Sequence, residues 1–559
     1  MSDRIDRRSF LARGAATGVG IAAIGASGGI LDACSSGSGS SSGTTGTSGH
    51  PNGVTTATPK KGGQLIFGTE AEEKGFSTTQ GTFDTTGIIY ARTVFDPLAI
   101  IDASGVVQPY LAQSITPNAD YTVWTITMRP NLVFHNGAPC DGAAVAENFA
   151  LQQASGLTGP AFTTIANVSV PSALVVTVTM KTPWVPFDYY LAGGIGGQIA
   201  FIAEPKWLKS GSQTNPIGTG PFVFQVWNPN DHFTATANPH YWRPGLPYLD
   251  SVTFKPIPDS EQLLATLQSG GVDIIHNSTA QVTGQLRSDT SLGYTDDSVH
   301  VAGEPDMNCL LLNLSKPPFD NQKVRQAAAM AISSAQYSQI IDKGICPPSN
   351  GPFVEGSPYF APTGYPEPDA AKAKQLVTEV QQQTGQPVSV TINHVPDPST
   401  TRIAEYLQQQ LQAAGMTVTL APVQQAQIIS TALLGTFEAQ VWRQFGAVNP
   451  DLNYIFWSPT NAVQSGFAIN MARNTDPNME TALLKGRQSP AQSDRTAAYQ
   501  EVGRLMGSTI PYVWTDRTVW SIGAQPKVQN WNNPTTPAGK PAFGMITGAI
   551  WPTQIWLSS

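Results

Sequence analysis

The one long apolar stretch of this chain lies at its N-terminus, between Gly14 and Leu31, and it limits what the remaining residues can form. A protein that crosses the membrane several times needs several stretches of about 20 apolar residues. No comparable stretch follows Leu31 in the 559-residue chain. We therefore expect the rest of the chain to fold in water, and its length predicts two or more domains.

The residues that flank this stretch are similar to those of bacterial export signals. Arg7 and Arg8 precede it, as in a twin-arginine signal, and residues 31–34 (Leu-Asp-Ala-Cys) end it like a lipobox. The alternative is an uncleaved membrane anchor, which the short, glycine-rich run disfavours. We expect residues 1–34 to be an export signal and Cys34 to be lipidated. The protein is then expected outside the cytoplasm, anchored to the cell membrane, in the periplasmic space or on the outer face of the cytoplasmic membrane.

The segment after the lipobox is dominated by Ser, Gly and Thr. Residues 35–59 contain no Lys, Arg, Asp or Glu and few large apolar side chains. Such a segment has little to bury, so we expect residues 35–61 to form a flexible linker.

Beyond residue 61 the composition becomes that of a packed protein. Hydrophobic residues make up 40% of the whole chain and charged residues 13%, which argues against general disorder. The formal net charge is −8, with 31 Lys and Arg residues, whereas nucleic-acid binding needs a basic surface. We therefore expect no nucleic-acid partner.

Strand and helix patterns alternate through this part of the chain. The strand-like segments are residues 64–68, 123–128, 174–180 and 272–275. Helical patterns begin at Asp259 or Ser260 and at Asp320 or Asn321, and a third pattern ends at Gly415. This alternation predicts α/β lobes with a ligand crevice between them.

A search for catalytic or metal-binding motifs returns none. The seven histidines include no H-x-x-x-H or H-x-H pair, and the cysteines include no C-x-x-C pair. We therefore expect no metal, no cofactor and no catalytic residue. Cys140, Cys309 and Cys346 follow the lipobox cysteine. In an exported protein two of these three can form a disulfide, and the sequence leaves open which two, if any.

Six blocks of sequence resemble, in order, family 5 of the extracytoplasmic solute-binding proteins of bacterial ABC importers, which includes dipeptide, oligopeptide and nickel binders. The blocks are residues 95–98 with 108–114, 124–137, 216–222, 238–242, 259–274 and 318–327. Residues 124–137, for example, are similar to the family stretch W-T-F-x-L-R-x-G-V-K-F-H-D-G. The resemblance extends from about residue 62 to the C-terminus.

The resemblance implies an α/β, two-lobed, periplasmic-binding-protein-like fold of type II, in its three-domain variant, with the ligand cleft between the lobes. Domain I is expected at residues 62–84, 215–306 and 511–559, and domain II at 85–214. Domain III, the second lobe, is expected at 307–510.

The implied function is capture of a small solute, with a peptide as the leading class, by lobe closure and its delivery to an ABC permease. The expected partners are the solute, the permease subunits and, through the lipid anchor, the membrane; the protein is expected to be a monomer and not an enzyme. The alternatives are a secreted hydrolase tethered by the same anchor, a family member that binds a non-peptide nutrient, and an adhesive surface lipoprotein.

One departure from the family pattern bears on the ligand. In the peptide binders, an aspartate three residues before a D-P-D-like element pairs with the α-amino group of the peptide. The corresponding position here is Gly446, and Asn449 replaces the first acid of the element. The α-ammonium group of a peptide ligand then lacks an acidic partner unless Asp451, Glu438 or another acid reaches it. This leaves room for an oligosaccharide, an opine-like compound or a blocked peptide.

The resemblance and the strand-end argument together predict a binding site. Its residues are Thr69, Glu70, Phe76, Thr82, Phe83, Trp442, Arg443, Gln444, Phe445 and Gly446. Trp442 and Phe445 are expected to stack on the ligand, and Arg443 to bind a carboxylate. The competing interpretation is that Trp442 is a core residue at the end of a strand and that Arg443 is solvated.

Overall fold

The structure is a computed structural model that describes residues 53–193, 198–298 and 303–558. The predicted export signal, the lipidation site Cys34 and most of the predicted linker lie outside these residues. Across the described ranges, no helix combines the length and apolar character that a bilayer crossing requires. Gly53, near the end of the predicted linker, packs against the ring of Trp531, and Lys61 Nζ donates to the carbonyl of Pro247 at 2.7 Å. The last part of the predicted linker therefore contacts the folded body.

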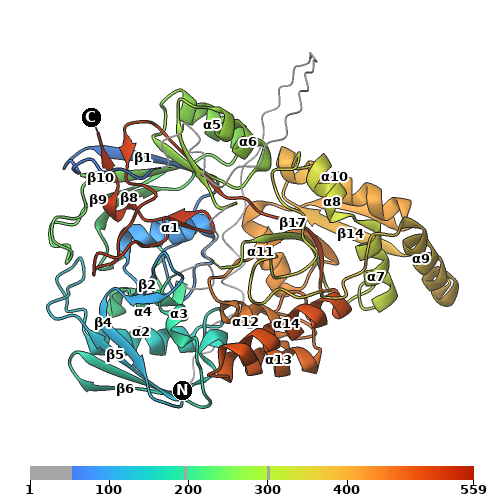
Figure 1. Cartoon of the computed structure of the whole chain (residues 1–559), viewed down its shortest axis with the longest axis horizontal. Coiled ribbons are helices and arrows are strands. Elements are labelled where there is room, and N and C mark those ends of the chain that lie inside the picture. The colour runs from blue at the N-terminus through green and yellow to red at the C-terminus, as the bar shows by residue number, and fades with distance from the viewer. Residues whose placement is uncertain (1–52, 194–197, 299–302, 559) are drawn as a thin grey trace, which may run out of the picture. The chain divides into compact units, whose positions relative to one another are not determined.

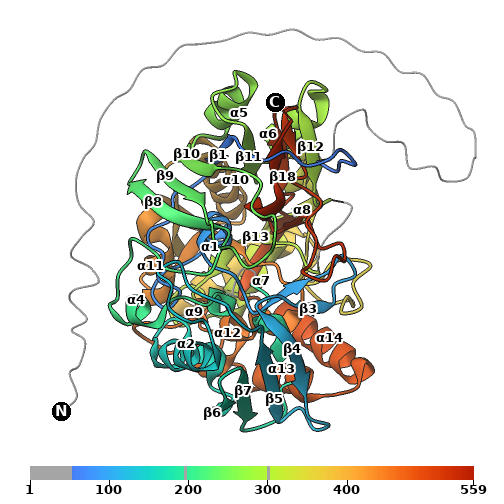
Figure 2. The same ribbon diagram turned by 90° about the vertical axis from the view of Figure 1, so that its left-hand side faces the viewer.

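A seven-stranded sheet has β1 between β10 and β11, as Figure 2 shows. In order across the sheet, the strands are β12 (Gly293–Asp296), β18 (Ser521–Ala524), β11 (Ile274–Asn277), β1 (Gln64–Thr69), β10 (Ser251–Pro256), β9 (His232–Ala237) and β8 (Phe222–Asn228). Strand β1 pairs in parallel with β10 and β11, and the other pairs are antiparallel. The carboxyl ends of β1 and β11 therefore lie at one edge of the sheet.

Alternation along β1 sends side chains into two apolar layers. Leu65 and Phe67 pack in a cluster with residues of α1 (Thr85–Val94). Ile66 packs on the other layer, with α5 (Ser260–Gln268) and α6 (Ala280–Ser288). The predicted cap of α5 is confirmed, because the Asp259 side chain accepts a hydrogen bond from the backbone of Gln262 at 2.8 Å.

A second, four-stranded sheet is antiparallel throughout. Its strands, in order, are β4 (Ala112–Pro117), β5 (Val123–Met128), β7 (Val175–Met180) and β6 (Ile165–Ser172). Its helices are α2 (Gly142–Ala154), α3 (Phe187–Tyr190) and α4 (Pro205–Lys209). Strands β5 and β7 correspond to two of the predicted strands, and their buried side chains alternate with half-buried ones.

A third, five-stranded sheet lies in the C-terminal half. Its strands, in order, are β15 (Thr417–Pro422), β14 (Ser389–His394), β16 (Ala439–Gln444), β13 (Met307–Leu312) and β17 (Tyr512–Arg517). Its helices are α7 (Gln322–Ala331), α8 (Ser334–Ile340), α9 (Ala370–Thr384), α10 (Pro398–Ala413), α11 (Gln425–Leu434), α12 (Tyr454–Trp457), α13 (Pro477–Gln488) and α14 (Gln492–Thr509). Asn321 caps α7, and α13 and α14 lie side by side (Figure 1).

Shorter elements complete the described residues. They are β2 (Ala99–Ile101), β3 (Val107–Pro109), β19 (Val528–Gln529), β20 (Met545–Ile546), β21 (Ala549–Ile550), β22 (Trp556–Leu557) and the 3₁₀ turns at Gly159–Phe162, Gln198–Ala200, Pro450–Asn453, Pro459–Asn461 and Pro552–Gln554. We call the seven- and four-stranded sheets with their helices the first lobe, and the five-stranded sheet with α7–α14 the second lobe.

The chain passes between the lobes at two places, which we call the crossing segments. The described residues of the first are 297–298 and 303–306, and the second comprises residues 518–520; hydrogen bonds join the two. The backbone N–H of Trp520 donates to Asp297 Oδ1 at 2.9 Å, and that of Thr518 donates to the carbonyl of Asp306 at 2.9 Å. The change of sheet therefore falls at 518–520. The boundary predicted at residue 511 placed β17 in domain I, whereas β17 pairs with β13 of the second lobe. The remaining domain boundaries stay predictions.

Apolar packing is not confined to one sheet at a time. The largest buried cluster combines side chains of the four-stranded sheet, such as Trp124 and Ile126, with side chains of the second lobe, such as Trp442 and Trp514. The three described cysteines are free, buried thiols, so none of the disulfides left open by the sequence is formed among them.

Candidate ligand-binding site

A charged cluster lies where the two lobes meet, beside the crossing segments. Its members are Glu70, His276 and Ser278 of the first lobe, Asp306 and Trp520 of the crossing segments, and Arg443 of the second lobe. We call these six residues the interlobe site.

Glu70 and Ser278 follow the ends of β1 and β11. Because these strands are parallel neighbours, both residues leave the sheet at its carboxyl edge, where open α/β sheets place their ligands. The Glu70 carboxylate accepts hydrogen bonds from the backbone N–H of Ser278 at 3.0 Å and from its hydroxyl at 2.9 Å. These bonds hold a carboxylate at the edge of the first lobe.

Arg443 extends from β16 toward that carboxylate. Its Nη2 donates to Ser278 Oγ at 3.1 Å, and its Nη1 lies 3.9 Å from Glu70 Oε1. The guanidinium carbon lies 4.8 Å from the centroid of the Trp520 ring, within range of a cation–π contact. The side chains of Arg443 and Glu70 are 34% and 19% exposed. The ion pair is therefore long and partly hydrated, and such pairs are weak.

Trp520 provides a fixed aromatic surface beside the arginine. Its ring is parallel to the His276 imidazole at a centroid distance of 5.7 Å, and its Nε1 donates to Asp306 Oδ2 at 2.9 Å. Burial lowers the pKa of His276 to about 4, so this ring is neutral at pH 7. Burial raises the pKa of Asp306, and the nearby Arg443 cation opposes that rise. An indole face and a cation thus stand together between the lobes.

The structure brings Glu70 and Arg443 of the predicted site together and buries several of the others. Thr69, Phe76 and Phe83 are buried in the first lobe, where Phe76 contacts Phe233 at a ring distance of 4.9 Å. Thr82 is half-buried.

The predicted residues of the second lobe divide in the same way. Trp442 and Gln444 are buried, and Trp442 belongs to the largest apolar cluster, which favours its interpretation as a core residue. Phe445 is half-buried and packs on Phe456 at a ring distance of 5.1 Å. The guanidinium of Arg443 is engaged between the lobes, so the interpretation of Arg443 as merely solvated does not describe it.

Gly446 is the position at which the family pattern predicts an amine-binding acid. A Cβ at this residue would lie 2.4 Å from the carbonyl oxygen of Glu304 and 2.7 Å from the backbone nitrogen of Asp306, so the backbone leaves no space for a side chain. The Gly446 N–H instead donates to Oδ1 of Asp306. Carboxylates that flank Arg443 are therefore supplied by Glu70 and Asp306, from other parts of the chain.

The two acids named from the sequence as substitutes have other partners. Glu438 accepts a hydrogen bond from the backbone of Thr391 at 2.6 Å. Asp451 forms an ion pair with Arg487, with Nε to Oδ1 at 2.9 Å, and the two side chains are 1% and 0% exposed. Neither acid joins the interlobe site.

The Asp451–Arg487 pair is a second junction between the lobes. Trp184 of the first lobe donates from Nε1 to Asp451 Oδ2 at 2.7 Å, and the Tyr190 hydroxyl donates to the Asp451 carbonyl. The Arg487 guanidinium lies 4.4 Å from the Trp184 ring and 3.7 Å from the Tyr454 ring. We call these five residues the buried junction.

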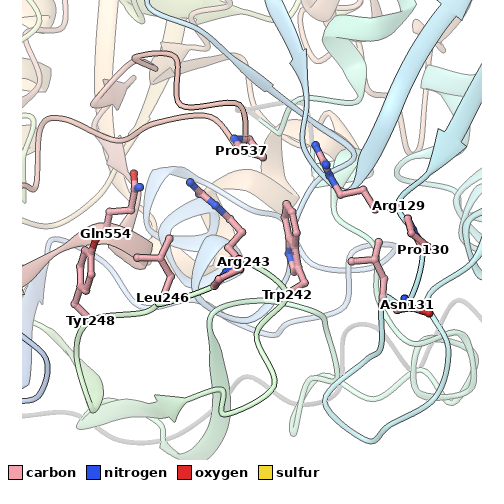
Figure 3. Close-up of a pocket in the computed structure, with 11 residues that line it drawn as sticks. Arg129, Pro130, Asn131, Trp242, Arg243, Leu246, Tyr248, Pro537 and Gln554 are labelled. Atoms are coloured by element: carbon pink, nitrogen blue, oxygen red, sulfur yellow. The ribbon is translucent and has the colours of Figure 1, made fainter.

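The pocket drawn in Figure 3 lies apart from the interlobe site. It has a volume of about 600 Å³, and its lining residues are Arg129, Pro130, Asn131, Leu132, Trp242, Arg243, Pro244, Leu246, Tyr248, Pro537 and Gln554. Figure 3 shows Arg129 and Arg243 on either side of Trp242. None of the predicted site residues lines this pocket.

Four residues of the interlobe site were missed by the sequence analysis. His276 and Ser278 sit at the end of a predicted strand, so the strand-end argument that selected Glu70 would have found them if applied to 272–275. Asp306 and Trp520 carry no local signal, because their role depends on where the chain crosses between the lobes.

Comparisons with known proteins agree with this architecture. The sequence model of the family described as bacterial extracellular solute-binding proteins, family 5 Middle, matches residues 106–466 of this chain. The glutathione-binding protein GsiB of Salmonella paratyphi A is 28% identical over 450 residues, which cover 78% of this chain and 83% of that protein.

Solved structures share the fold. The oligopeptide-binding protein AppA of Bacillus subtilis, in complex with a nonapeptide, has a TM-score of 0.77 and 19% identity, with 90% of this chain and 100% of that chain covered. The periplasmic binding protein AgaA of A. tumefaciens R10, in complex with agropinic acid, has a TM-score of 0.76 and 21% identity, with 89% and 99% covered. The predicted two-lobed α/β fold is confirmed. The family match over more than half of the chain shows that this protein belongs to the bacterial extracellular solute-binding proteins of family 5, the extracytoplasmic substrate-binding components of ABC importers.

Proposed function

We propose that this protein captures a small peptide-like solute that carries a carboxylate, closes its lobes on it and delivers it to an ABC permease. The observation that carries the proposal is the position of Arg443. Its guanidinium projects from the second lobe to the carboxyl edge of the first-lobe sheet, beside an aromatic face. A planar guanidinium binds a carboxylate through two parallel hydrogen bonds.

The weak pair with Glu70 leaves Arg443 able to exchange partners. At 3.9 Å and with both groups partly hydrated, the existing pair contributes about 1 kcal/mol or less. A ligand carboxylate that takes two close hydrogen bonds replaces it at little cost. Glu70 is then left to face a cationic group of the same ligand, which a free peptide supplies as its ammonium.

Lobe closure follows from the same geometry. A solute that contacts Arg443 on one lobe and Glu70 or Ser278 on the other binds the closed arrangement more tightly than the open one, and so shifts the protein toward it. The similar proteins support the ligand class, because they are a glutathione-binding protein and binding proteins in complex with a nonapeptide and with agropinic acid.

The test begins with native mass spectrometry of the protein purified from its own cells, to identify the bound solute. Calorimetry then compares glutathione and trialanine with trialanine amide and with N-acetyl-trialanine. We expect the amide to bind about 10- to 100-fold more weakly than the free acid, because it loses a hydrogen-bonded charge. Equal affinity for the acid and the amide would contradict a carboxylate site.

Matched variants locate the contact. Arg443→Gln should lose the preference for the free acid, whereas Arg504→Gln, an exposed arginine paired with Glu501 on α14, should retain it. If no peptide binds but a co-purified solute is found, the peptide class is wrong and the importer role stands. Turnover of ester, peptide or glycoside substrates would instead support the hydrolase alternative.

We also propose that Cys34 is lipidated after export and that the Ser/Gly/Thr-rich linker tethers the body to the membrane surface. Cys34→Ala should change the mass of the protein by the missing lipid and release it from the membrane fraction. Unchanged mass and fractionation would contradict the anchor.

A further inference from the structure

A cluster of potential metal ligands lies outside the interlobe site, next to the second crossing segment. It comprises Asp342, Cys346 and Asp516, whose ligand atoms all lie within 4.8 Å of one another. The three residues are 8%, 2% and 0% exposed. Asp342 follows α8, Cys346 lies four residues later, and Asp516 is in β17, so two separate segments converge here.

The two carboxylates of this cluster are buried, and the charge of Arg443 acts on Asp516 from beyond ion-pair distance. Among the residues that the structure describes, neither Asp342 nor Asp516 forms an ion pair, and Asp342 Oδ2 has no hydrogen-bond partner. Ionising two carboxylates this close together in a buried site costs free energy, because the like charges repel each other and neither is hydrated. The arrangement calls for a positive charge between them, either a shared proton or a metal ion.

The surrounding atoms favour the metal ion. Asn308 Nδ2 donates to Asp516 Oδ2 at 2.7 Å and Thr515 Oγ1 donates to Asp516 Oδ1 at 2.8 Å, as hydrogen bonds commonly orient a ligating carboxylate. The Ser338 hydroxyl donates to the Cys346 carbonyl at 2.6 Å, which fixes the turn that presents the thiol. A thiolate with two carboxylate oxygens is a ligand set that Zn²⁺ accepts.

We propose that Asp342, Cys346 and Asp516 bind a divalent cation of the zinc class, with water as the fourth ligand. In a tetrahedral site the donor atoms lie about 3.3–3.8 Å apart. The three ligand atoms here lie within 4.8 Å of one another, which is close to that spacing. The sequence analysis expected no metal because it searched for short His and Cys motifs, whereas this set combines a four-residue spacing with a strand 170 residues further along.

The proposed metal site lies beside the second crossing segment, so a bound ion would affect the connection between the lobes. Cys346 packs with Val519, in the second crossing segment, and with Ala280 of the first-lobe helix α6. Asp516 lies two residues before that crossing segment begins. A bound ion therefore ties the loop after α8 to the strand that enters the crossing, and stiffens one of the two connections between the lobes.

The test uses Co²⁺ as a spectroscopic probe on the whole purified protein after treatment with a chelator. We expect one equivalent of Co²⁺ to produce the near-ultraviolet thiolate-to-cobalt absorption, and one equivalent of Zn²⁺ to remove it. Cys346→Ser should abolish the band. Cys140→Ser and Cys309→Ser, which alter the other buried free thiols, should leave it unchanged.

A second variant separates ligation from folding. Asp342→Asn keeps the thiol and the shape of the site, and should weaken Co²⁺ binding by at least tenfold while circular dichroism of the metal-free protein stays as in the parent. Added Zn²⁺ should raise the melting temperature of the parent and not that of Cys346→Ser. Absence of the thiolate band in the parent, or its persistence in Cys346→Ser, would overturn the proposal and leave a shared proton as the charge between the acids.

Discussion

Among the residues that the structure describes, two arginine–carboxylate pairs join the lobes, and they differ in length and in exposure to water. In the buried junction, Arg487 Nε lies 2.9 Å from Asp451 Oδ1, and both side chains are essentially inaccessible to water. In the interlobe site, Arg443 Nη1 lies 3.9 Å from Glu70 Oε1, and both side chains remain partly exposed. The first pair is fully enclosed by its neighbours, whereas the second is accessible to solvent.

The difference arises from what surrounds each arginine. Arg487 lies among Trp184, Tyr190 and Tyr454, and its charge is compensated by hydrogen bonds as well as by ring faces. Within the described part of the chain, Arg443 has one aromatic ring face against it, that of Trp520. The comparison teaches that the same pair of residue types acts as a fixed joint when enclosed and as an exchangeable contact when hydrated.

The largest effect is expected from breaking the buried junction. Asp451→Asn leaves the Arg487 charge buried without its partner, so the free energy of unfolding should fall by about 3–5 kcal/mol. Urea denaturation followed by circular dichroism measures this change. Asp494→Asn, an exposed acid in the first turn of α14, serves as the control and should change it by less than about 1 kcal/mol. A loss as small as that of the control would contradict the role assigned to the junction.

The next effect concerns the backbone that supports the interlobe site. A Cβ at Gly446 meets backbone atoms of residues 304–306, which cannot rotate away. Gly446→Ala should therefore lower the free energy of unfolding by about 1–3 kcal/mol. The control is Gly156→Ala, where no atom lies within 4 Å of the added Cβ and little change is expected. Equal stability of the two variants would show that this close approach does not exist in solution.

The fold was readable from the sequence wherever local chemistry decides structure. Strand-like patterns predicted β1, β5 and β7, with alternation of apolar and polar residues in the last two. Candidate caps at 259–260 and 320–321 predicted where α5 and α7 begin, and the structure uses Asp259 and Asn321. The assignment of β17 failed, because its pairing with β13 joins segments some 200 residues apart. No local pattern specifies which strand edge such a segment selects.

The candidate site could be predicted from the sequence only in part, because it too depends on contacts between segments far apart in the chain. Glu70 and Arg443 were named because each lies at a strand end or in a family-like stretch, but the pairing of Glu70 with Ser278 spans 208 residues. At position 446 the sequence showed that an acid is absent. It did not show that the backbone of residues 304–306 fills the space and that Asp306 brings a carboxylate there.

In the interlobe site, the buried ring of His276 should make the free energy of unfolding depend on pH. Burial holds the pKa of His276 at about 4 in the folded protein, below the value of about 6.5 for an exposed histidine. His276 therefore contributes its full stability above pH 6.5, and that contribution is lost as pH falls toward 4, because the unfolded chain takes up the proton first. The slope attributable to this one group is at most about 1.4 kcal/mol per pH unit.

The measurement is the free energy of unfolding between pH 4 and 7. His276→Gln should remove this part of the slope, whatever it does to the stability at pH 7, whereas His240→Gln, which alters an exposed histidine, should leave the slope unchanged. Identical slopes for the parent and His276→Gln would show that the ring is not held neutral in the folded protein.

The smallest effect on folding is expected at Arg443 and Glu70, the pair that we propose contacts the ligand. A double-mutant cycle of Arg443→Gln and Glu70→Gln should give a coupling of about 1 kcal/mol or less in the free energy of unfolding, because the pair is long and hydrated. The same cycle measured on the affinity for trialanine should give a larger coupling, since a ligand that contacts both lobes engages the cation and the carboxylate at once. A folding coupling near 3 kcal/mol would mean that Arg443 and Glu70 form a second fixed joint, and the distinction between the two junctions would then fail.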